Sequence, residues 1–143
     1  MAVASGALHA VTPYLMYRDA AGAIEFCRVV FGAVEVMRHV ADDGRIVHAQ
    51  LRVPGPSTEI GDALLMLSQA TPAYEAWMPA VESRAPSPAS LFIEVADADA
   101  TVAEALAHGA SLMHPIGDND YGRSGSVRDP FGYVWHVTSQ PRA

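Results

Sequence analysis

The chain has 143 residues, half of them hydrophobic, and its 16 acidic residues against 9 Lys and Arg give a formal charge of −7. A chain of this length and apolar content fits one compact domain that needs no disulfide or structural metal to fold. The acidic balance argues against nucleic acid as a partner, because phosphate contacts require clustered Lys and Arg. It suits either a cationic ligand or simply solubility.

The cellular setting is predicted from cysteine content and from the lack of targeting segments. Cys27 is the only cysteine, so it cannot form an internal disulfide, which is typical of a reducing compartment. We expect it to be a small buried residue inside a helix. The amino-terminal MAVASGALHA lacks the basic and apolar parts of a signal peptide. No apolar run reaches the roughly 18 residues that a membrane span needs. We therefore expect a soluble, cytoplasmic protein without membrane contact.

The first half of the chain predicts one helix between extended segments. Asp19 follows an apolar run and suits a helix N-cap, because its carboxylate accepts hydrogen bonds from free backbone N–H groups. Apolar side chains then recur at helical spacing. Gly32 suits the left-handed conformation that ends a helix. The apolar positions that define this helix are Ile24, Phe26, Val30 and Phe31.

Three extended segments follow this helix. Residues 34–40 and 46–53 flank Asp43-Gly44, which favours a hairpin turn. Residues 63–68 form the next predicted strand. The first half is therefore predicted to be β-α-β-β-β, over residues of about 11–68. A connector rich in Pro and Ala follows at 69–89.

The second half, about 90–138, repeats this order. Residues 91–95 predict a strand, and Asp97 or Asp99 starts a helix that runs over 99–108. Residues 111–115 predict a strand, and 117–125 predict a loop rich in Gly and Asp. A closing hairpin then turns at Asp129-Pro130-Phe131-Gly132. Two copies of one strand–helix–strand unit therefore make up the chain.

Three segments carry a family resemblance. PYLMYRDAAGAIEFCRVVFGAVEV, DDGRIVHAQLRV and GRSGSVRDPFGYVWHV occur in this order. Together with the repeat, they resemble the glyoxalase/bleomycin-resistance/dioxygenase family, also called the vicinal oxygen chelate superfamily. The resemblance covers roughly residues 11–138. It implies an α+β fold in which two βαβββ modules form a curved mixed sheet around a central pocket, with the helices outside. It also implies a homodimer.

The resemblance also implies where a metal would bind. Metal-using members carry His or Glu on the first and last strand of each module. These positions map here to Thr12, Met66, either Ser90 or Leu91, and His136. Only His136 is a good ligand for a divalent ion, so we expect the usual metal site to be missing and no cofactor.

A different catalytic set remains open. Side chains alternate along strands, so His48, Glu94 and His136 could converge in the pocket. Two His and one carboxylate suit non-haem iron or zinc. Alternatively, the two His form hydrogen bonds without metal and Glu94 faces solvent. The other four histidines are expected to be surface or structural residues: His9, His39, His108 and His114.

Aromatic and polar side chains complete the predicted pocket, because ligand sites are mainly apolar with a few placed polar groups. Some of these candidates lie on predicted strands and others in the connector or in the loop before the last hairpin. They are Tyr14, Gln50, Met66, Trp77, Phe92, Tyr121 and Arg123.

Two functions follow from these residues and from the resemblance. The first is a small-molecule-binding protein of the vicinal oxygen chelate type without the usual metal, of the kind that sequesters an antibiotic. The second is an enzyme, either a glyoxalase-like lyase, an isomerase or epimerase, or a dioxygenase. It would use His48 or His136 as a base, with or without a divalent metal.

Overall fold

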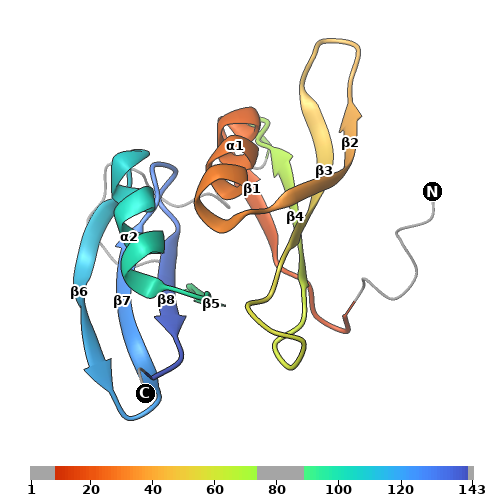
Figure 1. The fold of residues 1–143 in the computed structure, drawn as a ribbon. Helices are drawn as coiled ribbons and strands as arrows, with labels where there is room; N and C mark the ends of the chain where they lie inside the picture. Colours follow the sequence, from red (N-terminus) through yellow and green to blue (C-terminus); the bar gives the residue numbers. More distant parts are fainter. Residues whose placement is uncertain (1–8, 74–88, 142–143) are drawn as a thin grey trace. The chain divides into compact units, whose positions relative to one another are not determined.

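The computed structural model describes residues 9–73 and 89–141. Most of the predicted connector, including Trp77, lies outside these residues. The elements fall into two modules with the same order (Figure 1). Module one contains β1 (Tyr14–Tyr17), α1 (Ala20–Phe31), β2 (Val34–Val40), β3 (Ile46–Val53) and β4 (Ala63–Gln69). Module two contains β5 (Leu91–Glu94), α2 (Ala98–Ala107), β6 (Ser111–Asn119), β7 (Gly122–Arg128) and β8 (Val134–Ser139).

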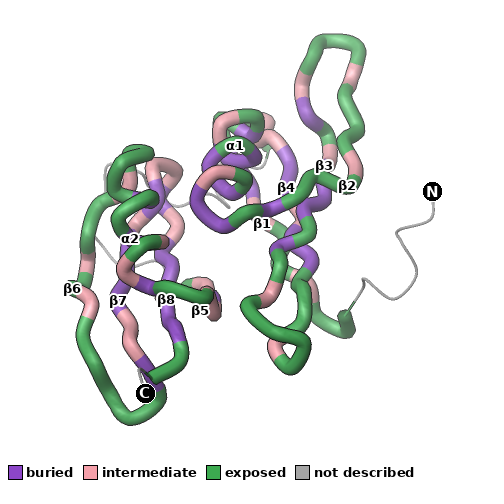
Figure 2. Tube along the Cα trace, viewed as in Figure 1, coloured by how far each residue is buried: buried purple, intermediate pink, exposed green. Residues whose placement is uncertain are grey.

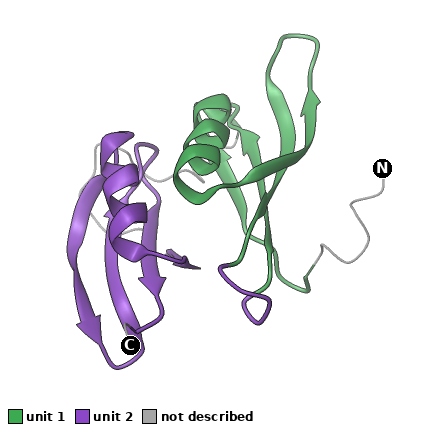
Figure 3. Ribbon diagram, in the orientation of Figure 1, with its two compact units in different colours: residues 1–55, 61–78 green, residues 56–60, 79–143 purple. Residues whose placement is uncertain are grey.

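Each module forms its own four-stranded mixed sheet, in the orders β1-β4-β3-β2 and β5-β8-β7-β6. The first and last strands of each module pair in parallel, and the other pairs are antiparallel. The predicted α+β fold with two βαβββ modules is therefore confirmed. The chain also divides into two compact units that largely follow the modules, and residues 56–60 of the β3–β4 loop join the unit of module two (Figure 3). The predicted pocket between the modules stays a prediction.

Helix α1 has the boundaries that its capping residues predict. The Asp19 carboxylate accepts a hydrogen bond from the Gly22 backbone N–H over 2.9 Å. Gly32 ends the helix with a φ of 69°, a left-handed conformation that glycine adopts without a steric penalty. Cys27 is buried in the helix, as expected.

Strand register separates the two faces of the module-one sheet, and both faces carry buried residues (Figure 2). Ala49 and Leu51 of β3 are buried and pair in register with Leu67 and Leu65 of β4. We assign these residues to the face that α1 covers. Because side chains alternate along a strand, His48 and Gln50 lie on the opposite face. We call this the helix-free face of module one.

The two faces of the module-two sheet are assigned in the same way. Arg123 of β7 forms an ion pair with Asp99 of α2, which places this side of β7 toward the helix. Val127 and Val137 lie on the same side and are fully buried. Alternation puts Ser126 and His136 on the other side, the helix-free face of module two.

Helix α2 begins one residue earlier than predicted. The Asp97 side chain accepts a hydrogen bond from the Ala100 backbone N–H over 3.1 Å, so Asp97 and not Asp99 is the N-cap. At the other end, the Nδ1 atom of His108 lies 2.9 Å from the Glu104 carbonyl oxygen. The Glu104 carbonyl also accepts the His108 backbone N–H over 3.1 Å, so the imidazole N–H can give it a second hydrogen bond at the end of the helix.

The predicted loop at 117–125 is wrong. Residues 111–119 and 122–128 form one long hairpin, with Tyr121 at its turn and Arg123 inside β7. Gly, Asp and Asn have low strand propensity, but strand pairing overrides this preference here. Two irregularities in the β6–β7 register also break the alternation that would have shown a strand.

Asp129 organises the turn before β8. Its carboxylate accepts hydrogen bonds from the backbone N–H groups of Phe131 and Tyr133 and from the indole Nε1–H of Trp135, each over 2.9 Å. Burial raises the pKa of Asp129, while these hydrogen bonds act in the opposite direction. Asp129 therefore supplies a hydrogen-bond acceptor to the buried Trp135 ring.

We predict that Asp129→Ala lowers the free energy of unfolding by about 2 to 4 kcal/mol, because it leaves a buried indole N–H and two backbone N–H groups without their acceptor. Chemical denaturation measures this change. Asp120→Ala, in the exposed hairpin turn, is the control and should change stability by less than about 0.5 kcal/mol. Equal effects of the two substitutions would refute the role given to Asp129.

Candidate functional site

Four of the predicted site residues meet on the helix-free face of module one. Tyr14 comes from β1, His48 and Gln50 from β3, and Met66 from β4. Tyr14 and Gln50 both pair in register with Met66, so β4 lies between the strands that carry them. The parallel pairing of β1 with β4 thus brings Tyr14 to the histidine of β3.

A chain of hydrogen bonds holds the His48 ring at both nitrogens. The Tyr14 hydroxyl lies 3.1 Å from His48 Nδ1, and the Gln50 amide nitrogen lies 3.0 Å from His48 Nε2. An amide nitrogen only donates, so His48 Nε2 accepts and Nδ1–H donates to the Tyr14 oxygen. The Tyr14 hydroxyl proton is then available for another acceptor.

The surroundings of His48 favour the neutral imidazole. Burial lowers the pKa of His48 from its ordinary value of 6.5, and the charge of His39, its partner in register on β2, lowers it further. Folding therefore lowers this pKa. The neutral His48 ring contributes fully to the free energy of unfolding above pH 6.5. This contribution is lost as the pH falls through the pKa of His48 in the folded protein.

Soft apolar side chains surround this polar chain. Met16, Leu64 and Met66 lie on the same face by register, and the Ser68 hydroxyl donates to the sulfur of Met16 over 3.2 Å. Gln50 is only 4% exposed, whereas Tyr14 is 49% exposed. The face thus combines an accessible hydroxyl with apolar walls, which is the usual composition of a small-molecule site.

The helix-free face of module two carries the other predicted residues of the sheet. His136 Nε2 lies 3.0 Å from the Ser90 hydroxyl. Phe92 pairs in register with His136 and is 60% exposed. Glu94 follows on the same side of β5, and its carboxylate lies 3.5 Å from the Gln140 amide nitrogen. Phe92, Glu94 and His136 are therefore neighbours on one face.

Two predicted residues lie elsewhere in module two. Tyr121 is exposed at the β6–β7 turn. Arg123 forms ion pairs with Asp99 and Asp118, and these contacts raise its pKa. Arg123 thus connects β7 to α2 and β6, on the side of the sheet opposite His136.

One polar pair was missed by sequence reasoning. His114, expected to be a surface or structural residue, lies with its Nδ1 atom 2.7 Å from the Ser126 hydroxyl on the helix-free face of module two. No alternation pattern indicates this position, because β6 is irregular on both sides of His114.

The residues at the positions implied for a metal do not form a typical site. In the described parts of the chain, no three His, Cys, Asp or Glu side chains gather closely enough to hold a metal ion. The mapped positions offer one imidazole, two hydroxyls and a thioether, a set that does not fit a divalent ion. The set of His48, Glu94 and His136 stays a prediction.

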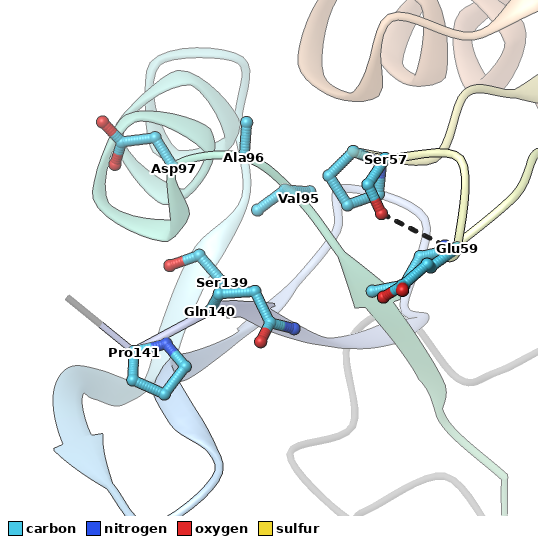
Figure 4. A pocket seen from close by; sticks show the side chains of 10 residues that line it. Ser57, Glu59, Val95, Ala96, Asp97, Ser139, Gln140 and Pro141 are labelled. Atoms are coloured by element: carbon cyan, nitrogen blue, oxygen red, sulfur yellow. Dashed lines mark hydrogen bonds between the residues drawn. The ribbon is translucent and has the colours of Figure 1, made fainter. Parts of the chain in front are cut away.

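A hollow of about 680 Å³ lies in the compact unit of module two (Figure 4). Residues 56–60 form one wall, with the Ser57 hydroxyl accepting a hydrogen bond from the Ile60 backbone N–H. The segment before α2 and the end of β8 form the rest. Its wall contains the carboxylates of Glu59 and Asp97 but none of the predicted site residues.

The family model described as the glyoxalase/bleomycin resistance protein/dioxygenase superfamily matches residues 7–137. The chain belongs to this superfamily, as its motifs predicted. No helix in the described part of the chain has the length and apolar character to cross a membrane.

Two uncharacterized relatives match most of the chain. Rv0887c, an uncharacterized protein of Mycobacterium tuberculosis, is 34% identical over 132 residues, which span 90% of this chain and 72% of the relative. Mb0911c, an uncharacterized protein of Mycobacterium bovis, is also 34% identical over 132 residues, 90% of this chain and 81% of its own.

Solved structures share the fold. TioX from Micromonospora sp. ML1 is 25% identical, with a TM-score of 0.65 over 94% of this chain and 98% of TioX. PA1353 from Pseudomonas aeruginosa is 22% identical, with a TM-score of 0.66 over 94% of this chain and all of PA1353. The fosfomycin resistance protein FosX from Listeria monocytogenes has a TM-score of 0.62 at 11% identity, over 92% of this chain and 93% of FosX. PA1353 and FosX show the fold alone.

We predict that His39→Gln raises the pKa of His48 but leaves it below 6.5, because the substitution removes the charge of His39 and not the burial of His48. Titration of the imidazole signals by two-dimensional ¹H–¹⁵N NMR measures this pKa. The same spectra should show the proton of neutral His48 on Nδ1. Arg38→Gln, an exposed substitution on the same strand, is the control and should leave the pKa of His48 unchanged.

Proposed function

We propose that this protein binds a small molecule on the helix-free face of module one through its own side chains, without a resident metal ion. The observation that carries this proposal is the hydrogen-bond chain from Gln50 through His48 to Tyr14. This chain fixes the orientation of the Tyr14 hydroxyl and leaves its proton to donate. A ligand carbonyl, ether or amide oxygen is the matching acceptor.

The side chains near Tyr14 favour a planar or amphipathic ligand. Met16 and Met66 are flexible and polarisable, so they adapt to flat apolar surfaces. The formal charge of −7 favours a cationic ligand over an anionic one. Sequestration of a cationic planar antibiotic, by a cytoplasmic homodimer, is the role that fits these features.

A second candidate function is catalysis. The lowered pKa of His48 keeps its imidazole neutral near pH 7, which suits a general base. An isomerase, epimerase, lyase or dioxygenase could use this base, and His136 and Glu94 are the other candidate catalytic residues. Turnover that His136→Ala abolishes would favour this second function, whereas saturable binding without turnover favours the first.

We predict that Tyr14→Phe weakens the binding of metal-free bleomycin, a cationic glycopeptide with a planar bithiazole, by about 5-fold to 10-fold. The loss corresponds to one hydrogen bond of about 1 to 1.4 kcal/mol. Isothermal titration calorimetry at moderate salt measures the affinity. Tyr133→Phe removes a hydroxyl from the Asp129 turn and should bind like the wild type. Equal affinity in the Tyr14 variant would overturn the proposed site. Absence of binding by the wild type would overturn this ligand class.

We also predict that protein treated with a chelator binds metal-free bleomycin as tightly as untreated protein, because protein side chains alone make the contacts. Elemental analysis and native mass spectrometry of the untreated sample report bound metal and oligomeric state. A stoichiometric metal ion, with binding that is lost on chelation and restored by that ion, would contradict the proposal.

A further inference from the structure

We propose that the helix-free face of module two is a small-molecule contact surface of its own, on which His114 donates a hydrogen bond from Nε2 to an oxygen of the ligand. This inference rests on the proposed class of function, the binding of a small molecule, and adds to it a specificity residue on an edge strand of module two. Three features of β6 and β7 support this inference. They are the irregular register of β6, the glycine at 125 that permits this register, and the serine at 126 that anchors the His114 ring.

The register of β6 places His114 on the helix-free face. Leu112 pairs with Val127 and His114 with Ser126, so Met113 is an extra residue on β6. In a regular ladder, Met113 would oppose Ser126 and His114 would lie on the side of α2. The bulge therefore reverses the side on which His114 lies. Bulges of this kind often occur beside functional sites, where they redirect a side chain.

Pro115 and Gly125 explain why the chain departs from regular pairing. Pro115 follows His114 on the edge strand β6 and has no backbone N–H to donate to a ladder. Opposite the irregular segment, a methyl group at Gly125 would lie 2.9 Å from the His114 carbonyl oxygen and 3.0 Å from the Ile116 backbone nitrogen. Only glycine at 125 admits this close approach of the two backbones.

The Ser126 hydroxyl fixes the orientation of the His114 ring. Its oxygen lies 2.7 Å from His114 Nδ1, and we assign the hydroxyl as the donor of this hydrogen bond. Ser126 is 2% exposed, so this anchor is held by the sheet beneath the imidazole. With Nδ1 accepting from Ser126, the ring proton lies on Nε2. That nitrogen has no hydrogen-bond partner among the described residues.

His114 also has a suitable neighbour for a shared ligand. Ser126 pairs in register with both His114 and His136, so the two imidazoles flank one buried serine on one face. The Ser90 hydroxyl anchors His136 through Nε2 in the same manner, which leaves the Nδ1 atom of His136 without a partner among the described residues. Two anchored rings, each with a free nitrogen, suit a ligand that carries several oxygen or nitrogen atoms along one edge.

We predict that His114→Leu weakens the binding of metal-free bleomycin by about 5-fold. His114→Gln should retain most of the affinity, because its amide supplies a donor at a similar position. Gly125→Ala should weaken binding like His114→Leu, since it displaces the bulge without changing the imidazole. His108→Leu, at the end of α2, is the matched control and should bind like the wild type.

Calorimetry on these variants is combined with ¹H–¹⁵N NMR of the wild type, in which bleomycin should shift the His114 Nε2–H signal. Wild-type binding with equal affinity in His114→Leu would overturn this contact and leave the proposed function intact. Absence of wild-type binding would overturn both. Loss in His114→Leu without a shift of the His114 signal would also overturn the contact, because it would indicate a structural effect.

Discussion

The parallel pairing of the first and last strand in each module is the constraint on which the candidate site depends. These strands are far apart in sequence, because parallel strands need a long crossover connection, which the helix and the two intervening strands provide here. In module one it sets Tyr14 beside Met66, and in module two it sets Phe92 beside His136. Each candidate site is therefore built from both ends of its module.

Each sheet has one face covered by its helix and one face that carries polar chemistry. The covered faces hold fully buried aliphatic side chains such as Leu67 and Val137. The helix-free faces hold imidazoles that neutral groups orient: Tyr14 and Gln50 for His48, Ser90 for His136, and Ser126 for His114. Neutral partners orient an imidazole without adding charge. This arrangement favours recognition of a ligand through hydrogen bonds over tight binding of a metal ion by carboxylates.

This pattern bears on how a member of a superfamily with metal-dependent enzymes can work as a binding protein. The positions at which metal-using members place ligands keep one imidazole, His136, which here has a serine partner. A hydroxyl in place of a second ligand converts a coordinating position into a hydrogen-bonding one. The same framework can then select a ligand by the positions of its oxygen and nitrogen atoms. Fold alone does not choose between these uses, so the site residues carry the functional argument.

The sequence predicted the fold because local chemistry and repetition agreed. Asp19 and Gly32 bound the first helix in the structure as their capping chemistry indicated. The alternation of β3 placed His48 and Gln50 on one side, as the structure shows. The segment 117–125 failed because Gly, Asp and Asn favour turns locally, and only pairing with β7 makes residues 117–119 a strand.

The sequence by itself determined the order of elements, the helix caps and the side of the regular strands on which each candidate lies, since these depend on neighbours along the chain. Only the tertiary structure decided that Tyr14 reaches His48, that Arg123 pairs with Asp99, and that His114 lies with Ser126. These contacts join residues on different elements. In the case of His114, a bulge reverses the alternation on which any reading of a strand from sequence relies.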